Sequence, residues 1–211
     1  MPDTRTVIVP AERVVRWFEN FATRHGDYEL TSTDGAVVAV APDGATAAVT
    51  SGWGPIPPVA SSAELAAWLL RDRHVGVLLV RKGAHAVGVF TGTTMDSSKV
   101  DTHYVQGRTK AGGWSQQRYA RRRDNQATKA FSEAADEAAL RLLPEVDHLE
   151  AVVCGGDSSA VSTVLADRRL EPLRGLVSAH GVLPTSEPRK VTLSEVIERA
   201  RSVSIALNDL A

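Results

Sequence analysis

Residues His74–Thr91 read HVGVLLVRKGAHAVGVFT, and this stretch decides the fold. Two eight-residue apolar runs, His74–Arg81 and Ala84–Thr91, flank the dipeptide KG. Runs of this length that are rich in valine and bounded by a glycine turn are typical of buried strands joined as a β-hairpin. A third strand is expected over Lys99–Val105, so the sequence predicts a three-stranded meander at the centre of the fold.

Strands and helices alternate further along the chain. Leu149–Cys154 and Gly175–Leu183 have strand character, whereas Ser158–Arg168 and Thr192–Leu207 have helical spacing of apolar residues. Hairpins followed by a β-α-β-α order are typical of a mixed β-sheet flanked by helices. We therefore predict an α/β (α+β) fold, with this domain covering residues 73–211.

The first 72 residues are expected to form a small N-terminal subdomain, a helix plus a β-meander. Apolar side chains at i, i+3, i+4 and i+7 predict a helix over Ala11–Arg24 that ends at Gly26. Ser61 and Glu64 form a capping box before a second, short helix, and Thr192 with Glu195 forms another before the last helix. The meander strands are expected at Tyr28–Thr33, Ala36–Ala41 and Ala45–Thr50.

Composition excludes several classes of protein. The chain has 211 residues, 43% hydrophobic and 23% charged, and no apolar run approaches the ~20 residues that would span a membrane. The start, MPDTRTVIVP, lacks the features of a secretory signal, and Cys154 alone cannot form an internal disulfide, so we expect a cytoplasmic protein. One cysteine and six histidines without ligand spacing predict no zinc or other metal site.

Charge is distributed unevenly along the chain. Residues 106–130 hold seven basic side chains and one carboxylate, a net charge of +6, whereas the other 186 residues hold 17 basic and 24 acidic side chains, a net charge of −7. A cationic segment on an acidic body indicates a local device for binding a polyanion. The alternative is a solvated helix face.

The cationic segment consists of a polar loop and the start of a long helix. The loop Gln106–Gln117 reads QGRTKAGGWSQQ, and the following helix is expected over Arg118–Leu143. Only the second half of that helix has a regular apolar face, so we expect the first half to project from the domain. Its arginines stand at the positive end of the helix dipole, an arrangement that an external anion such as phosphate would compensate.

The run Tyr104–Gln117 (YVQGRTKAGGWSQQ), leading into an arginine-rich helix, resembles the catalytic loop of the Vms-like release factor (VLRF) peptidyl-tRNA hydrolases. The family pattern Gly-x-x-Gln is matched by GWSQ at residues 113–116, and the chain looks like a bacterial-type member. That family is similar to the catalytic middle domain of eukaryotic and archaeal class I release factors, which carries Gly-Gly-Gln. The resemblance covers residues 73–211 and implies that domain's ribonuclease H-like topology.

The chain departs from the release-factor motif in two ways. Trp114 and Ser115 separate the glycine pair from the first glutamine, so a strict Gly-Gly-Gln is absent. Gln117 follows directly and competes with Gln116 for the catalytic role.

The resemblance implies a ribosome-associated hydrolase that releases nascent peptides from stalled large ribosomal subunits, a role in translation termination and ribosome quality control. Gln116 would orient water at the peptidyl-tRNA ester, and Gly112 and Gly113 would let the loop approach closely. The implied partners are rRNA and peptidyl-tRNA, with no cofactor, no DNA and no membrane, and the protein partners are unknown. The residues expected to contact RNA are Arg108, Lys110, Trp114, Arg118, Tyr119, Arg121, Arg122 and Arg123.

Other functions stay open at this point. The same loop could position a ribose hydroxyl and make the protein a tRNA 3′-end endonuclease, or the chain could be a non-catalytic ribosome- or RNA-binding module. A metal-dependent nuclease would have to build on Asp96 and Asp101. Cys154 could act as a nucleophile with His180. The sequence CGGD at residues 154–157 lacks a phosphate-loop pattern and is expected to be a strand-to-helix turn capped by its aspartate or by the next serine.

Overall fold

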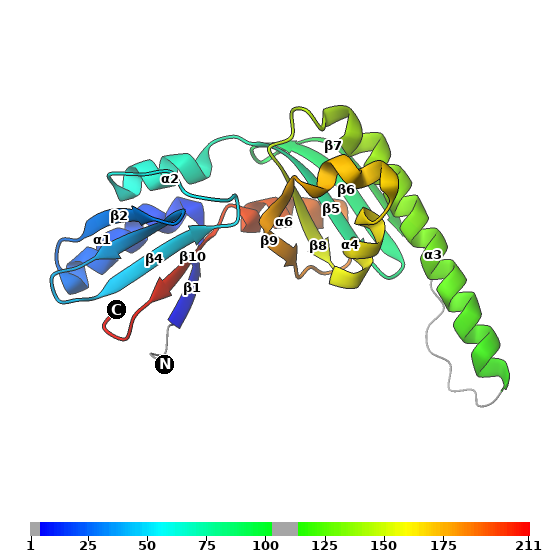
Figure 1. The fold of residues 1–211 in the computed structure, drawn as a ribbon, viewed down its shortest axis with the longest axis horizontal. Helices are drawn as coiled ribbons and strands as arrows, with labels where there is room; N and C mark the ends of the chain where they lie inside the picture. Colours follow the sequence, from blue (N-terminus) through cyan, green and yellow to red (C-terminus); the bar gives the residue numbers. More distant parts are fainter. Residues whose placement is uncertain (1–4, 103–113) are drawn as a thin grey trace. The chain divides into compact units, whose positions relative to one another are not determined.

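The computed structural model describes residues 5–102 and 114–211, with side chains of helix α3 (Trp114–Leu142) described from Thr128 onward. The described residues form an α+β fold with two five-stranded β-sheets and six α-helices (Figure 1). They divide into two compact units. Unit 1 comprises Met1–Asp72, Ser178–His180 and Glu198–Ala211, and unit 2 comprises Arg73–Val177 and Gly181–Ile197. No helix in the described ranges has both the length and the apolarity to cross a lipid bilayer.

Unit 2 is built on a mixed sheet. Its strands are β5 (His74–Arg81), β6 (Ala84–Thr91), β7 (Thr94–Thr102), β8 (Ala151–Gly156) and β9 (Val177–Leu183). The order is β7-β6-β5-β8-β9, in which the first three strands are antiparallel and β8 runs parallel to both β5 and β9. The predicted hairpin is confirmed residue for residue. Its two strands are buried along nearly their whole length, which explains their continuous apolar sequence.

The third strand of the meander differs from the prediction. It begins at Thr94 instead of Lys99, because a tight turn at Gly92 (φ +59°) lets Thr94 pair directly with Thr91. The predicted residues 103–105 lie outside the described residues. The polar residues at the start of β7 conceal this strand in the sequence.

Helices cover both faces of the mixed sheet. The second half of α3, together with α4 (Ser158–Leu165) and α5 (Glu171–Arg174), packs on one face, where the buried cluster includes Leu78, Val87 and Val152. The short 3-10 helices η2 (Leu143–Glu145) and η3 (Arg168–Leu170) connect these elements. On the other face lies α6 (Lys190–Ala200), whose buried Leu193 approaches Gly88 of β6.

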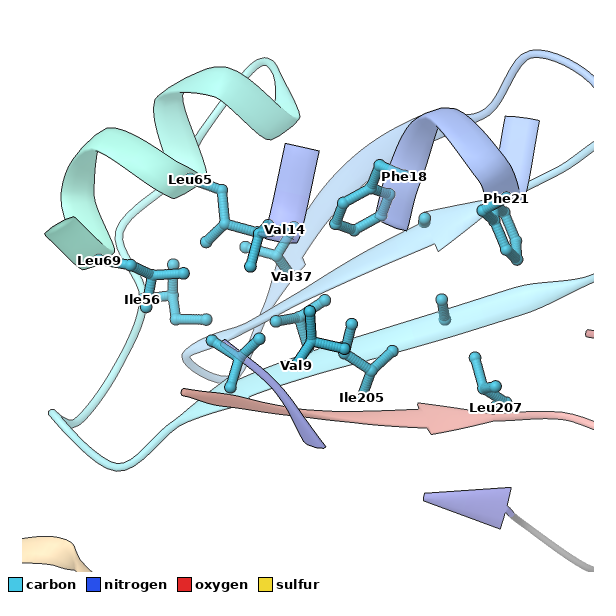
Figure 2. Packing of buried hydrophobic residues seen from close by; sticks show 14 of the residues in the cluster. Val9, Val14, Phe18, Phe21, Val37, Ile56, Leu65, Leu69, Ile205 and Leu207 are labelled. Atoms are coloured by element: carbon cyan, nitrogen blue, oxygen red, sulfur yellow. The ribbon is translucent and has the colours of Figure 1, made fainter. Parts of the chain in front are cut away.

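Unit 1 contains an antiparallel sheet with two helices on one face. The strand order is β1 (Arg5–Val9), β10 (Val203–Leu207), β4 (Thr46–Ser51), β3 (Ala36–Val40) and β2 (Glu29–Thr33). The helices are α1 (Val14–His25), which follows the 3-10 turn η1 (Ala11–Arg13), and α2 (Ser62–Leu70). Figure 2 shows Phe18 of α1, Leu65 of α2 and Ile205 of β10 pointing into one apolar core.

Local signals in unit 1 are confirmed where they depend on neighbouring residues. Gly26 ends α1 with φ +87°. Ser61 Oγ accepts a hydrogen bond from Glu64 N at 3.2 Å, which is the first half of the predicted capping box. Glu64 Oε2 accepts a hydrogen bond from Ala60 N at 2.8 Å, one residue before the N-cap.

The predicted last helix over Thr192–Leu207 is wrong in its second half. The structure has α6 and then strand β10, which pairs with β1 on one side and β4 on the other. Val203, Ile205 and Leu207 are buried with strand alternation, although Val203 and Leu207 also continue the apolar stripe of α6. The Thr192 cap is wrong too, because the helix begins at Lys190 and Thr192 Oγ1 donates to the Glu187 carbonyl at 2.9 Å.

The N-terminal part is therefore larger than a helix with a meander. Strands β1 and β10 extend its sheet from three strands to five, and Glu198–Ala211 belong to unit 1. The division into domains of residues 1–72 and 73–211 stays a prediction. Strand β10, near the end of the chain, pairs with β1 and β4 of the N-terminal sheet.

Candidate functional site

The predicted catalytic segment connects β7 to α3. Its loop residues Arg108, Lys110, Gly112 and Gly113 lie outside the described residues, and for residues 114–127 the structure describes only the backbone. The predicted residues whose side chains are outside the described part are Trp114, Gln116, Gln117, Arg118, Tyr119, Arg121, Arg122 and Arg123. Their chemical roles stay predictions.

Helix α3 begins at Trp114 instead of the predicted Arg118, which sets Gln116 in its first turn. The first four N–H groups of an α-helix have no partner inside the helix, and they carry the positive end of its dipole. The first turn of α3 contains no acidic residue that would neutralise this end. The backbone at the glutamine motif is thus suited to an external negative charge.

Helix α3 is longer than the sheet beneath it. Its 29 residues correspond to about 43 Å, whereas the nine residues of β7 correspond to about 30 Å. Figure 1 shows the N-terminal turns of α3 extending past the end of the unit 2 sheet. The backbone therefore carries the motif away from the core, as the uneven apolar pattern of this helix predicts.

The second half of α3 is fixed in the core of unit 2. Ala134, Ala138 and Leu142 are fully buried and lie on one helix face. Small side chains allow the helix backbone to approach the sheet closely, so this half is a firm base for the projecting half.

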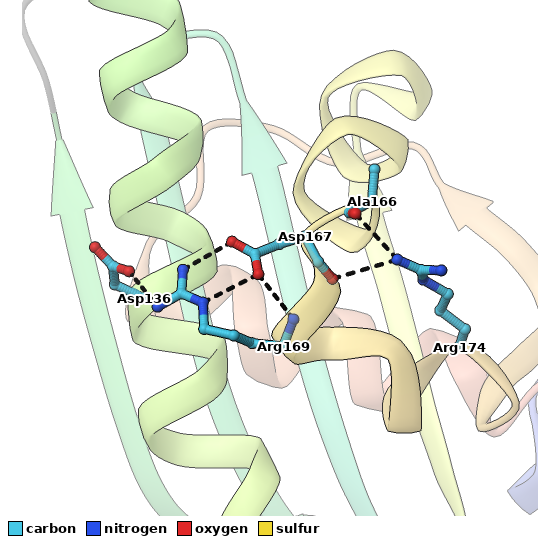
Figure 3. A network of polar contacts seen from close by, with 5 residues as sticks. All are labelled: Asp136, Ala166, Asp167, Arg169 and Arg174. Carbon is cyan, nitrogen blue, oxygen red and sulfur yellow. Dashed lines mark hydrogen bonds and ion pairs between the residues drawn. The ribbon is translucent and has the colours of Figure 1, made fainter.

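A polar network connects the second half of α3 to η3 (Figure 3). Arg169 of η3 contacts Asp136 of α3 and Asp167, with nitrogen–oxygen distances of 2.7 Å in each pair. The pKa of Asp167 is lowered to about 2, mainly by hydrogen bonds from the side chain and backbone of Arg169. Arg174 donates to the carbonyls of Leu165 and Ala166 at 2.7 and 3.0 Å.

Sequence reasoning missed this network. The Asp-x-Arg spacing at residues 167–169 could have indicated the local pair, but nothing in the sequence indicates that Asp136 joins it. The other charged residues described on α3 include neighbours at i and i+4, Lys129 with Glu133 at 3.7 Å and Arg141 with Glu137. Cations in this half of the helix are compensated within the chain.

The carboxylates considered for a metal-dependent nuclease do not form a centre. Both lie on β7, where Asp96 Oδ2 accepts a hydrogen bond from Thr91 Oγ1 at 2.8 Å and Asp101 Oδ1 accepts one from Thr102 N at 2.8 Å. Within residues 5–102 and 128–211, no three His, Cys, Asp or Glu residues are grouped so that they could hold a metal ion.

Cys154 is not the nucleophile that one alternative requires. It is fully buried, and burial raises the pKa of its thiol to about 12, so the reactive thiolate is scarce at neutral pH. Both ring nitrogens of His180 have other partners, the Ser178 hydroxyl at 3.0 Å and the Ala200 carbonyl at 2.8 Å.

The glycine-rich turn after β8 has a structural role. Gly156 has φ +107° and contacts the Val80 strand so closely that a Cβ would overlap the Val80 carbonyl oxygen. The predicted strand-to-helix turn is confirmed, but Asp157 makes no side-chain capping bond to α4. Its carboxylate instead accepts from Lys82 N at 3.3 Å and lies 3.5 Å from Arg81 Nε, which holds the β5–β6 turn.

The region of the chain that contains this segment matches a known protein family. The family described as Actinobacteria/chloroflexi VLRF1 release factor matches residues 73–206. Curated relatives include peptide chain release factor subunit 1 of Thermococcus sibiricus and of Thermococcus onnurineus, each 28% identical over 131 residues. These alignments cover 61% of this chain and 31% of each relative, so the chain spans about a third of their length.

Two solved structures are also similar to this chain over part of their length. The crystal structure of the archaeal translation termination factor aRF1 has a TM-score of 0.49 at 16% identity, over 77% of this chain and 48% of that one. A structure described as an archaeal protein has a TM-score of 0.44 at 15% identity, over 76% of this chain and 51% of that one.

Proposed function

Because this chain belongs to the Actinobacteria/chloroflexi VLRF1 release factor family, we propose that it is a peptidyl-tRNA hydrolase that frees nascent peptides from stalled large ribosomal subunits. The observation that carries the proposal is the position of the GWSQ motif. Its last three residues occupy the first turn of a 29-residue helix whose far half is buried in the core. This arrangement puts the backbone of the glutamine motif at a projecting helix N-terminus, whose first N–H groups have no partner inside the helix.

The residues suit the hydrolysis of an ester. Water must be oriented toward the ester carbonyl, and the oxygen that becomes negative needs hydrogen-bond donors. Gln116 carries a neutral amide that orients the water without titrating, and the N–H groups of the first turn of α3 supply donors. Gly112 and Gly113 let the preceding backbone enter a narrow site in RNA. The reaction needs no cofactor.

The remaining residues of the segment bind RNA. Arg108, Lys110, Arg118, and the run Arg121–Arg123 contact phosphates of rRNA or tRNA, and Trp114 and Tyr119 stack on bases. The strand order β7-β6-β5-β8-β9 supports the further proposal that unit 2 has the ribonuclease H-like topology of the release-factor catalytic domain. The protein acts in the cytoplasm, where its substrate is made.

A single assay tests the function. Stalled peptidyl-tRNA–ribosome complexes are incubated with the protein, and gel electrophoresis resolves intact tRNA, shortened tRNA and freed peptide. We expect free peptide and intact tRNA. Shortened tRNA would show that the protein is an endonuclease and not a peptidyl-tRNA hydrolase. Ribosome binding without either product would show that it is a non-catalytic binding module.

Two adjacent glutamines provide matched variants. Gln116→Ala should lower the rate of peptide release by about 100-fold or more, the scale for losing one preorganised group at developing charge, with little change in ribosome binding. Gln117→Ala has the same chemical change and should lose far less. Full activity of Gln116→Ala would reject it as the catalytic residue.

A further inference from the structure

Two neighbouring grooves lie on unit 1 beside helix α1. The larger, about 520 Å³, runs between α1 and the end of β1 and includes Arg13, Arg16 and Trp17. The smaller, about 140 Å³, includes Arg5 and Arg24 and shares Trp17 with the first. Among the described residues, no aspartate or glutamate side chain lines either groove.

The basic residues of this region are concentrated at the grooves. Residues 1–72 hold five basic and nine acidic side chains, and four of the five basic ones line the two grooves. The basic side chains of residues 1–72 are therefore grouped on one surface, although the segment as a whole is acidic. We call this surface, made of Arg5, Arg13, Arg16, Trp17, Asn20 and Arg24, the α1 arginine surface.

The sequence of α1 produces this segregation by helical spacing. At about 100° per residue, Arg13, Asn20 and Arg24 fall within roughly 40° of one another, and Arg16 and Trp17 flank them. The acidic residues of this region, Glu12 and Glu19, fall roughly 100° or more from the centre of that stripe, on a neighbouring face. Glu12 is also paired, with Arg201 at 3.4 Å.

Within the part of the chain whose side chains the structure describes, the four arginines lack an ion-pair or side-chain hydrogen-bond partner. No ion pair or side-chain hydrogen bond among those residues involves the guanidinium of Arg5, Arg13, Arg16 or Arg24. Arg13 is exposed on η1, and Arg16 and Arg24 are exposed on α1. Other arginines of the fold do have partners. They include Arg81, Arg141, Arg169, Arg174, Arg189 and Arg201.

An aromatic side chain stands in the middle of these cations. Trp17 is half-buried, stacks on Phe21 with ring centroids 5.6 Å apart, and meets Phe18 edge-on at 5.0 Å. Because its ring is fixed on one side by the core, its free side offers a rigid stacking surface at small entropic cost.

We propose that the α1 arginine surface binds the backbone of single-stranded RNA, as a second contact separate from the basic start of α3. Guanidinium groups match phosphate geometry, and a fixed aromatic ring beside them stacks a base. The choice of RNA over an acidic protein rests on the proposed function, whose substrate lies among rRNA and tRNA. The charge of the surface complements a phosphate chain, and the described residues that line the grooves beside its arginines include no aspartate or glutamate.

The test measures affinity for a fluorescein-labelled oligouridine over a range of salt concentrations. The protein is the full chain in which Arg121, Arg122 and Arg123 are replaced by Gln, so that binding by α3 is reduced. The test variant adds Arg13→Gln, Arg16→Gln and Arg24→Gln together to this background. Three lost phosphate contacts should reduce the log–log salt slope by about 2 and the affinity at 0.1 M salt by about 10- to 100-fold.

A control variant removes equal charge elsewhere. Lys82, Lys99 and Arg168 are exposed residues of unit 2, and replacing all three by Gln should change the affinity much less. Equal losses in both variants, or no loss in the α1 variant, would overturn the proposal. Tighter binding of polyglutamate than of RNA would overturn it as well and assign the surface to an acidic protein segment. Because the readout is RNA affinity, failure of peptide release by the unmodified protein stays a separate result.

Discussion

Replacing Leu142 by alanine should destabilise unit 2 by about 4 kcal/mol, because this side chain anchors the buried end of α3. Leu142 is fully buried, and Leu→Ala at such sites costs about 2–5 kcal/mol. The upper part of that range applies because Leu142 packs over Gly76 of β5, where a Cβ would lie 3.0 Å from Leu142 Cδ2. The backbone of β5 is held in the sheet and cannot shift to fill the cavity that Leu142→Ala leaves.

Urea unfolding followed by circular dichroism measures this loss, and hydrogen exchange of peptides from α3 and β5 locates it in unit 2. For a chain of this size, 4 kcal/mol corresponds to a fall in melting temperature of about 8–16 °C. Leu140→Ala is the matched control, since Leu140 is on the same helix but 69% exposed. Its effect should stay within about 0.5 kcal/mol.

Gly76→Ala probes the same contact from the other side. Alone, the new methyl group crowds Leu142, but in the Leu142→Ala background it occupies the space that the leucine leaves. The two changes should therefore couple by more than about 1 kcal/mol in the favourable direction. A loss below 1 kcal/mol for Leu142→Ala, or strictly additive effects in the double variant, would refute the proposed anchoring contact.

Two further predictions concern the connections around β8 and α4. Gly156→Ala should lower the free energy of unfolding in urea by at least about 2 kcal/mol, because φ is +107° and the methyl group would overlap the Val80 carbonyl. Gly175→Ala is the control and should be nearly neutral, since the space around Gly175 is open. Similar costs for the two variants would contradict this account. Asp167, whose pKa is lowered to about 2, should add stability that is present above pH 4 and lost as the pH falls toward 2. Carboxyl NMR titration should place this pKa near 2 and return it toward 3.8 in Arg169→Met, and an unchanged midpoint would reject the pairing.

The parts of the fold that local sequence determines were predictable. The β5–β6 hairpin has two continuous apolar runs and a glycine turn, and the capping box of α2 lies within four residues. Strand β10 was not predictable in this way. Its VSIAL sequence continues the helical stripe of α6, and only pairing with β1 and β4, far away in sequence, selects the extended backbone.

The candidate site also has features that local sequence predicts and features that depend on distant contacts. Its motif and its excess of cations can be read from adjacent residues, and so can the change of character halfway along α3. The support beneath it depends on Asp136 and Arg169, which are 33 positions apart and belong to different elements. The α1 arginine surface escaped notice because its charges are spread among acidic neighbours and gather only when the chain coils into a helix.

The place of β10 in the N-terminal sheet fixes the order in which the protein can mature during its own synthesis. Ser51 of β4 pairs with Val203, so this strand pairing joins positions about 150 residues apart. At roughly 5–20 residues per second, the nascent chain waits about 8–30 s between making β4 and making its neighbour. All the strands of unit 2 are synthesised within that interval. The sheet that begins the chain is therefore the last to close, and until then β1 and β4 have exposed edges that a chaperone or another nascent chain can pair with.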